Sequence, residues 1–415
     1  MKITDVKTIR LRAEIPPEGQ VFSRSGVRNC RSTTLVQVDT DEGVTGLGSC
    51  SGNGDLVEVI VAKVLKPLLV GVDPIEIDEI WEKAYVRGGH KEFGTRGVGV
   101  VALSGIDIAL WDILGKVRGV PVYELLGGKC RDKVPVYATA LYPEEPSKVA
   151  KRARAFAERA FHGVKIKVGF DLAQDIRIVR AVRAELGNDF TIMTDANQGY
   201  TIDVALKAAE AFSGCGVFWL EEPLFVEDIA GHAALREKGK VPIAVGENLH
   251  TYYAFENFVV RDAVDFLQPD VARAGGISEI RKIAVLAAKH NIALSFHTWG
   301  DGVALAASLH LSAALKQCGV MEELDYTYNP LRAELLQEPL EVKNGFMVPP
   351  DKPGLGVELN RDALERFVFS GVEELTIRPS ALRSALVTHA DPSTVTGDPN
   401  SLGTVNLSSP APYGK

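Results

Sequence analysis

The sequence lacks long hydrophobic runs and an excess of positive charge. No uninterrupted apolar stretch reaches the roughly 18–20 residues that a transmembrane helix needs. The opening MKITDVKTIRLRAEIPP mixes charges where a signal peptide would have an apolar core. The formal net charge of −8 argues against a surface for nucleic acid or anionic membranes. These absences favour a cytoplasmic protein with neither a nucleic-acid nor a membrane partner.

Cysteine is scarce and scattered. The five cysteines form no C-x-x-C pair, so the sequence indicates neither a disulfide framework nor a zinc cluster; they are Cys30, Cys50, Cys130, Cys215 and Cys318. Hydrophobic residues make up 46% of the chain and charged residues 24%, as in a globular protein with a full core. At 415 residues the chain is too long for one compact domain and long enough for two.

A regular alternation begins near residue 134. Short β-branched runs alternate with longer amphipathic, alanine-rich stretches such as 147–160, 171–186 and 277–290. The strand candidates cover residues 134–139, 163–169, 190–197, 216–223, 241–247, 264–272, 292–299 and 320–324. Eight strands separated by seven helices predict an α/β fold, a (β/α)7β modified TIM barrel, over residues 131–325.

The regions on either side of the barrel have a different pattern. Within residues 1–130, the segment 33–49 predicts two antiparallel strands around a DEG turn, and 99–119 predicts an apolar helix that ends at a glycine. We expect an α+β capping domain here, completed by a return segment at 326–380. Residues 381–415 are rich in Ser, Thr, Pro and Gly, which is typical of a disordered tail or an arm that docks on a neighbouring subunit.

Polar side chains occur at the carboxyl ends of seven consecutive predicted strands. The run Val217 to Leu220 is apolar, as in a strand buried on both faces, yet it ends in Glu221 and Glu222. The strand-end residues are Lys165, Lys167, Asp195, Glu221, Glu247, Asp270, His297 and Glu322. From Lys167 onward they are 23 to 28 residues apart, about one βα unit. A single acid at a strand end is typical of a helix N-cap. Polar groups at the ends of seven successive strands instead predict a shared site at the barrel rim.

Three of these acids predict a metal site. Asp195, Glu221 and Glu247 follow successive strands, and three converging carboxylates repel one another unless a cation neutralises them. Ligands that are all oxygen favour Mg²⁺ over softer ions. Asn197 lies on the same strand face as Asp195 and can support the ligands, whereas Glu222 points away by strand alternation and is expected behind them.

The remaining rim residues predict acid–base chemistry. Lys165 and Lys167 share one face of their strand, and two ammonium groups near a cation lower each other's pKa, so that one lysine can act as a neutral base. A solvated lysine pair is the alternative. Asp270 beside His297 would fix the imidazole tautomer and raise its basicity. A histidine packed in the core is the alternative there.

Taken together, these segments resemble a known family. VKIKVG, TDANQGY, WLEEPL, VGENLH, QPDVARAGG and SFHTWG are similar to motifs of the enolase superfamily, mandelate racemase subgroup, and the resemblance covers residues 1 to about 375. It implies Mg²⁺ on Asp195, Glu221 and Glu247. It also implies Lys167 as one acid–base and the His297–Asp270 pair as the other. The family's glutamate on the eighth strand matches Glu322, while Ser49-Cys50 replaces the Gly-Glu of many relatives.

The resemblance also implies a reaction and a substrate class. Removal of the proton α to a carboxylate forms an enediolate, and the preferred hypothesis is syn- or anti-dehydration of a sugar acid, an aldonate or aldarate, to a 2-keto-3-deoxy acid. The alternative is a racemase or epimerase of a 2-hydroxy acid that uses the same Lys167 and His297. A barrel that binds a ligand without turnover, or a Schiff-base lysine, would leave the three converging carboxylates unexplained.

The sequence also offers candidates for holding the substrate. The likeness to the family implies that loops at about 16–27 and 49–55 close over the site and that the protein is a homo-oligomer. Lys165 is expected to pair with the substrate carboxylate, and Glu322, if protonated, to hydrogen-bond to it. The candidates for a hydroxyl-rich substrate are Arg24, His90, Tyr142 and Trp299.

Overall fold

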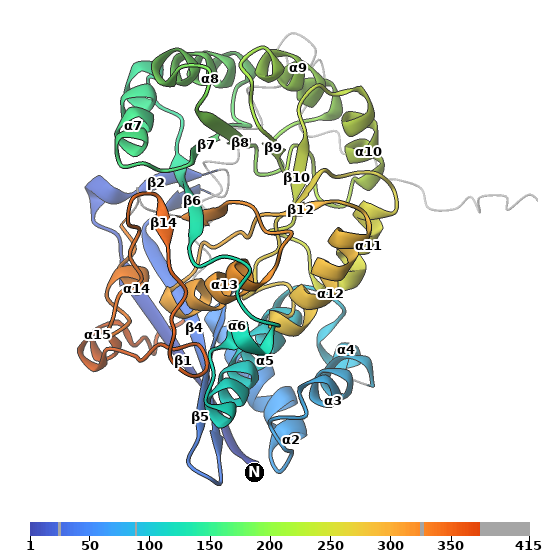
Figure 1. Ribbon diagram of the computed structural model, residues 1–415, viewed down its shortest axis with the longest axis vertical. Helices are drawn as coiled ribbons and strands as arrows, with labels where there is room; N and C mark the ends of the chain where they lie inside the picture. Colours follow the sequence, from blue (N-terminus) through green and yellow to red (C-terminus); the bar gives the residue numbers. More distant parts are fainter. Residues whose placement is uncertain (24–25, 88, 324–327, 374–415) are drawn as a thin grey trace, which may run out of the picture.

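The computed structural model describes residues 1–23, 26–87, 89–323 and 328–373. Two parts lie side by side in it: an α+β cap domain built on the first strands, and a barrel surrounded by helices (Figure 1). The predicted tail at 381–415 and the candidate Arg24 lie outside the described residues.

The cap domain contains a three-stranded antiparallel sheet in the order β1-β4-β5, in which β4 and β5 are the two strands that the sequence predicts. Its strands are β1 (Ile3–Glu14), β4 (Cys30–Thr40) and β5 (Thr45–Cys50), and β2 (Val21–Ser23) pairs separately with β3 (Gly26–Arg28). The short helical segments are η1 (Pro17–Gly19), α1 (Gly54–Ile60), η2 (Val61–Leu65), α2 (Lys66–Leu69), α3 (Ile77–Trp81), η3 (Glu82–Val86), α4 (Gly89–Phe93) and α6 (Val122–Leu125).

A long apolar helix, α5 (Val98–Arg118), packs against β5. Gly46 and Gly48 on β5 permit this close approach, because a Cβ at either position would collide with a backbone carbonyl of the helix. The helix ends where Gly119 adopts a left-handed conformation, at the stop that the sequence predicts. It is apolar and long enough to cross a membrane, but 89% of its most apolar window is buried, so it is a core helix of the protein.

The second part is the predicted (β/α)7β barrel. Its strands are β6 (Val134–Leu141), β7 (Gly163–Lys167), β8 (Thr191–Asp195), β9 (Leu220–Glu221), β10 (Ile243–Val245), β11 (Phe266–Leu267), β12 (Ala293–Leu294) and β13 (Met321–Glu323). Neighbours along the chain pair in parallel from β6 to β12, and β13 pairs in parallel with β6. A parallel bridge between Leu294 and Cys318 joins β12 to the segment that leads into β13 and closes the barrel.

One helix follows each of the first seven barrel strands and covers the outside of the barrel (Figure 1). These helices are α7 (Pro146–Glu158), α8 (Leu172–Leu186), α9 (Ile202–Ser213), α10 (Ile229–Lys238), α11 (Thr251–Val259), α12 (Gly276–Lys289) and α13 (Gly302–Ala314). The strands are shorter than their apolar runs because regular pairing ends at the rim. There Asn197, Glu222 and Gly246 have φ angles of 40°, 38° and 156° and turn the chain out of the sheet.

The sequence predicts that the apolar run before Glu221 is buried on both faces, and this prediction is wrong for one of its residues. Phe218 is 44% exposed, although Trp219 and Leu220 are buried. Strand β9 begins at Leu220, so Phe218 lies ahead of the paired strand. Its ring packs at 5.2 Å, between centroids, against Phe266. The apolar character of Phe218 therefore serves an aromatic contact at the amino end of the barrel.

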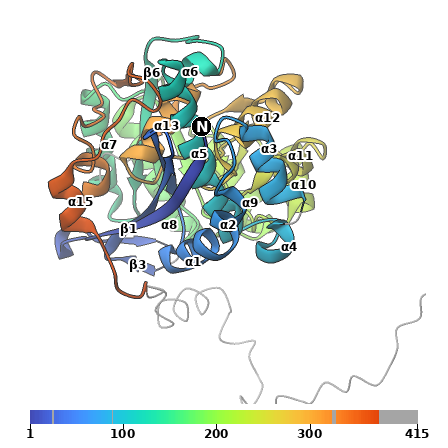
Figure 2. The same ribbon diagram turned by 90° about the horizontal axis from the view of Figure 1, so that it is seen from below.

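After β13 the chain returns to the cap domain through α14 (Pro330–Ala333), β14 (Phe346–Met347) and α15 (Arg361–Phe367). Strand β14 pairs antiparallel with β6. Farther on, the amide of Phe369 donates to the carbonyl of Arg10 on β1 at 2.8 Å. Helix α15 accordingly lies beside β1 in both views (Figures 1 and 2).

Two buried polar contacts dock the cap domain on the barrel. The first is Asp301, whose Oδ2 accepts hydrogen bonds from Thr33 and Ser49 of the cap sheet at 2.5 Å and 2.6 Å. The Asp301 Oδ1 accepts from two backbone amides at the start of α13, so the same carboxylate caps that helix. Ser49 therefore contributes to the docking of the cap domain on the barrel.

The second contact joins α5 to the start of α12. Ser104, Asp107 and Trp111 lie on one face of α5. Their side chains bond to the amide of Gly275, the amide of Ser278 and the hydroxyl of Ser278, at 2.9 Å, 3.0 Å and 2.9 Å respectively. The N-cap residue of α12 is Gly275, which has no side chain that could supply such a bond. Side chains of the cap domain therefore accept hydrogen bonds from backbone amides at the amino end of α12, the helix that follows Asp270.

Candidate active site

Three carboxylates converge at the barrel rim. Asp195 ends β8, Glu221 ends β9, and Glu247 follows β10 by two residues. One oxygen from each lies within 4.8 Å of the others, and Asp195 and Glu221 are almost fully buried. Like charges at this distance are costly without a compensating cation. A set of three carboxylates fits a hard divalent ion such as Mg²⁺, so these residues form a candidate metal site.

Two lysines from β7 contact this cluster from one side. Lys165 is fully buried, and its Nζ donates to both carboxylate oxygens of Glu221 at 2.8 Å and 2.9 Å. Lys167, two residues nearer the rim, donates to Asp195 and, at 3.1 Å, to the side-chain oxygen of Asn197. The alternation of the strand places both ammonium groups inside the barrel.

Opposing effects set the pKa of Lys167. Burial lowers it, but the Asp195 carboxylate raises it, with Glu247 acting in the same direction, and the net pKa lies above the ordinary value. Lys165 does lower the pKa of Lys167, as expected for two ammonium groups. The net pKa is raised because the effects of Asp195 and Glu247 together outweigh those of burial and Lys165. A neutral lysine base therefore requires that this charge be compensated.

A histidine contacts the cluster from the other side. Nδ1 of His297 lies 2.7 Å from Oδ2 of Asp270, and Nε2 of His297 lies 3.4 Å from an oxygen of Glu247. Oδ1 of Asp270 accepts from the amide of Ala272 at 2.8 Å, which fixes the carboxylate. Lys167 on Asp195 and His297 on Glu247 thus flank one carboxylate cluster.

Asn197 and Glu222 have different environments. The amide of Asn197 donates to Asp195 at 2.8 Å, and its side chain donates to Glu247 at 3.3 Å, so it connects two candidate ligands. Glu222 lies outside the three-carboxylate group and accepts from Asn248 at 3.0 Å and 2.8 Å. Burial, and then the charge of Glu247, raises the pKa of Glu222 well above its usual range.

The other predicted site residues are spread more widely. Trp299 lies beside the cluster, with Lys167 Nζ 5.6 Å from its ring centroid, and buried Tyr142 is close enough to influence the pKa of Lys167. His90 binds the carbonyl of Tyr85 at 2.7 Å within the cap domain, and none of its described contacts reaches the carboxylates. Glu322 lies on β13, in register with Tyr137 of β6.

Comparison with known families agrees with this architecture. Residues 7–127 match the mandelate racemase/muconate lactonizing enzyme N-terminal domain, and residues 148–363 match the enolase C-terminal domain-like family. The chain belongs to the mandelate racemase subgroup of the enolase superfamily. The family resemblance of its sequence motifs is therefore confirmed.

Several proteins of known sequence are similar to this superfamily member over most of their length. It is 40% identical to D-galactarolactone cycloisomerase of Agrobacterium fabrum, over 88% of this chain and 99% of that protein. It is 39% identical to L-talarate/galactarate dehydratase of Salmonella typhimurium, over 79% of this chain and 81% of that protein. A crystal structure of a racemase from Streptomyces coelicolor with bound magnesium is 32% identical, with a TM-score of 0.80 over 88% and 100% of the two chains.

Sequence reasoning missed several polar residues around the superfamily site. Gln268 donates to Glu221 at 2.8 Å, and the indole of Trp219 donates to the same oxygen at 3.3 Å. Both lie two residues from a predicted site residue, so strand alternation could have indicated them. Asn248 and Arg273 lie beyond the strands, where no period predicts the direction of a side chain.

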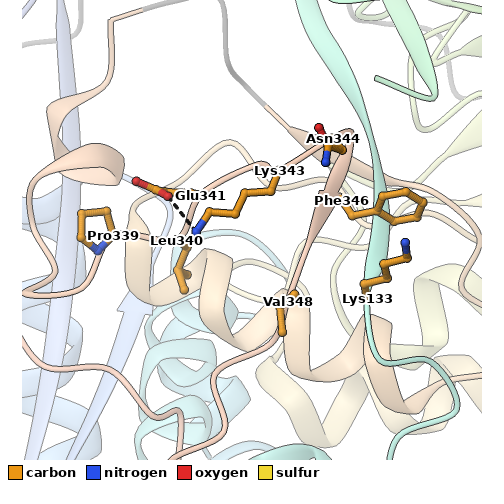
Figure 3. Close-up of a pocket in the computed structure, with 8 residues that line it drawn as sticks. All are labelled: Lys133, Pro339, Leu340, Glu341, Lys343, Asn344, Phe346 and Val348. Carbon is orange, nitrogen blue, oxygen red and sulfur yellow. Dashed lines mark ion pairs between the residues drawn. The ribbon is translucent and has the colours of Figure 1, made fainter. Parts of the chain in front are cut away.

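A cavity of about 400 Å³ lies apart from the rim (Figure 3). It is next to the start of β6 and β14, at the amino end of the barrel, and includes the Glu341–Lys343 ion pair. Its lining consists of Lys133, Pro339, Leu340, Glu341, Lys343, Asn344, Phe346 and Val348. None of the predicted site residues lines it.

Proposed function

We propose that this enzyme removes the proton α to the carboxylate of a sugar acid and then eliminates the β-hydroxyl, giving a 2-keto-3-deoxy acid with Mg²⁺ as cofactor. The observation that carries the proposal is the placement of two acid–base groups around one carboxylate cluster. Lys167 contacts Asp195, and His297 contacts Glu247. A substrate carboxylate held at this cluster would have one such group on each side of its α-carbon.

Asp195, Glu221 and Glu247 would hold the Mg²⁺, whose charge stabilises the enediolate as it forms. Lys167 takes the α-proton once its ammonium is deprotonated. Lys165, beneath it in the barrel, provides positive charge for the substrate carboxylate.

His297 donates the proton that the departing hydroxyl needs, and Asp270 holds the imidazole so that Nε2 faces the substrate. Glu322 donates a hydrogen bond to the second carboxylate oxygen if it is protonated. Trp299, Tyr142, His90 and Arg24 are proposed to select the hydroxyl-bearing chain of the substrate, with Trp299 and Tyr142 nearest to Lys167.

Ring-opening elimination is the second candidate function. It is favoured by the 40% identity with D-galactarolactone cycloisomerase. If the β-oxygen belongs to a ring, its expulsion opens the ring and no atom leaves, so the product is an isomer of the substrate. The same acid and base serve both reactions. Racemisation or epimerisation of a 2-hydroxy acid remains the third outcome of the same enediolate.

Incubation of the Mg²⁺-loaded enzyme in D₂O with aldonates, aldarates and their lactones distinguishes these outcomes. A semicarbazide-reactive product that has lost one water, apart from the deuterium that its enol takes up from the solvent, supports dehydration. A keto product that has lost no water and differs from the substrate only by that deuterium supports ring opening. Deuterium at Cα without a keto product supports racemisation and contradicts elimination. Full turnover in EDTA, or by Glu247→Gln, contradicts the metal-dependent proposal.

Two variants test the roles of the acid and the base. Lys167→Ala is expected to lose both α-proton exchange and product. His297→Asn is expected to retain exchange of the α-proton while product formation falls roughly 10²–10⁴-fold, because only the leaving group lacks its acid. Equal loss of exchange in both variants would contradict this assignment.

A further inference from the structure

Arg273, which lies between β11 and α12, connects the cap domain to a metal-ligand segment. Its three side-chain nitrogens donate to three acceptors on different residues. Nε donates to the carbonyl of Glu247 at 2.9 Å, Nη1 to the carbonyl of Ser51 at 3.3 Å and Nη2 to the side-chain oxygen of Asn248 at 3.3 Å. Ser51 belongs to the cap domain, whereas Glu247 and Asn248 follow barrel strand β10.

The contact with Ser51 is reinforced by the backbone. The amide of Ser51 donates to the carbonyl of Ala272 at 3.1 Å, so residues 272 and 273 bind both polar backbone atoms of Ser51. Ser51 lies immediately after β5, in the segment expected to close over the site. The position of this cap segment and the position of the Arg273 side chain therefore depend on each other.

The contact with Asn248 extends to the carboxylates. While Arg273 binds its side-chain oxygen, the Asn248 amide nitrogen donates to Glu222 and, at 3.3 Å, to the Glu247 carboxylate. Arg273 thus holds Glu247 at its own carbonyl and also through its neighbour. The Glu247 side chain has few orientations that preserve all of these bonds.

The shape of the guanidinium group, rather than its charge alone, explains why position 273 is arginine and not lysine. Among the described residues Arg273 has no ion pair, and the three acceptors that it binds are two backbone carbonyls and one side-chain amide oxygen. A lysine ammonium carries the same charge on a single nitrogen and cannot reach three acceptors that surround a planar fork.

We propose that Arg273 is a positioning residue that couples the cap segment at Ser51 to Glu247, so that metal affinity depends on this contact. The inference rests on the proposed function only in taking Glu247 as a ligand of the cation. Loss of residues that orient metal ligands typically weakens binding roughly 10–100-fold.

Arg273→Lys tests the proposal, and Arg183→Lys is a matched control. Arg183 also binds several carbonyls, those of Cys215, Gly187, Phe190 and Gly216, but at the amino end of the barrel. Mn²⁺ binding is measured by electron paramagnetic resonance, with Mg²⁺ as competitor, alongside KM, kcat and thermal unfolding. Arg273→Lys is expected to weaken Mn²⁺ binding roughly 10–100-fold, whereas Arg183→Lys lowers stability and leaves the affinity unchanged.

Rescue of Arg273→Ala by low millimolar methylguanidinium adds a readout that a general loss of stability would not change. Mn²⁺ affinity is expected to recover in Arg273→Ala and to stay constant in Arg183→Ala. If the Arg273 variants do not fold, Asn248→Ala breaks the connection at the next residue and should weaken binding in the same direction.

Wild-type affinity in Arg273→Lys, or equal weakening in both lysine variants, would overturn the inference while wild-type turnover still supported the proposed function. Absence of Mn²⁺ binding and turnover in the wild type would overturn both.

Discussion

Lys165 donates to both carboxylate oxygens of Glu221, at 2.8 Å and 2.9 Å, where neither side chain has appreciable contact with solvent. The candidate metal site is therefore partly charge-compensated by the protein itself. A buried pair of this kind contributes little net stability, but removal of one partner leaves an uncompensated buried charge.

Replacement of Lys165 should show how far the stability of the fold depends on the charge that compensates Glu221. Lys165→Met is expected to lower the free energy of unfolding in EDTA by roughly 3–5 kcal/mol, because Glu221 stays buried without a counter-charge. Saturating Mg²⁺ should reduce the loss. Urea unfolding with EDTA and with Mg²⁺ measures both values. Lys343→Met, which breaks the exposed pair with Glu341, is the control and should change little. Equal losses with and without Mg²⁺ would argue against the Lys165 prediction.

Mg²⁺ should stabilise the folded protein in a saturable way. Because the three carboxylates lie within 4.8 Å of one another in the folded state, a cation at 100 times its Kd is expected to add about 2.7 kcal/mol to the free energy of unfolding. Glu247→Gln should remove most of this gain. Thermal unfolding over a Mg²⁺ series measures it, with NaCl of equal ionic strength as the control. A linear, unsaturated response in the wild type would be evidence against a specific site.

Asp270 should affect turnover more than binding. Asp270→Asn preserves the size of the side chain but replaces a carboxylate that lies 2.7 Å from His297 Nδ1 with a neutral amide. The histidine then loses the partner that fixes its tautomer, and kcat is expected to fall roughly 10²–10⁴-fold. Steady-state kinetics and α-proton exchange measure the effect. Mg²⁺ affinity near the wild-type value is the internal control, and an unchanged kcat would remove Asp270 from the mechanism.

Asp107 should make stability fall as pH rises through neutrality. Burial raises the pKa of this carboxyl to about 7, above the ordinary value of 3.8 that it regains on unfolding. The folded state therefore binds more protons than the unfolded state in this interval. Asp107 makes its full contribution to the free energy of unfolding below about pH 4. This contribution is lost as the pH rises toward about 7, and the free energy of unfolding then falls by at most about 1.4 kcal/mol per pH unit.

Asp107→Asn tests this slope directly. The amide keeps an oxygen that can accept from Ser278, but it has no charge to bury. Urea unfolding between about pH 5 and pH 8 should show a weaker decline for the variant than for the wild type. Parallel curves for the two proteins would show that Asp107 does not titrate in this range.

Much of the barrel rim could be predicted from strand period and spacing. Asp195, Glu221 and Glu247 are 26 residues apart, one βα unit each, and the closed parallel barrel brings them together. The same reasoning does not give the net pKa of Lys167, because its direction depends on how much charge surrounds it in three dimensions. It failed for Phe218, because strand β9 starts at Leu220, three residues after the apolar run begins at Val217.

The sequence by itself determined the order of the strands, the end of the barrel at which polar groups gather and the set of oxygen ligands. Those features follow from local periodicities, which each segment carries independently. Only the tertiary structure decided that Arg273 joins Ser51 to Glu247 and that Asp301 receives Thr33 and Ser49. The contacts of Arg273 with Ser51 and of Asp301 with Thr33 and Ser49 link residues more than 200 positions apart. Arg273 and Asp301 lie in loops without a period, so the geometry is set by how the cap domain packs on the barrel.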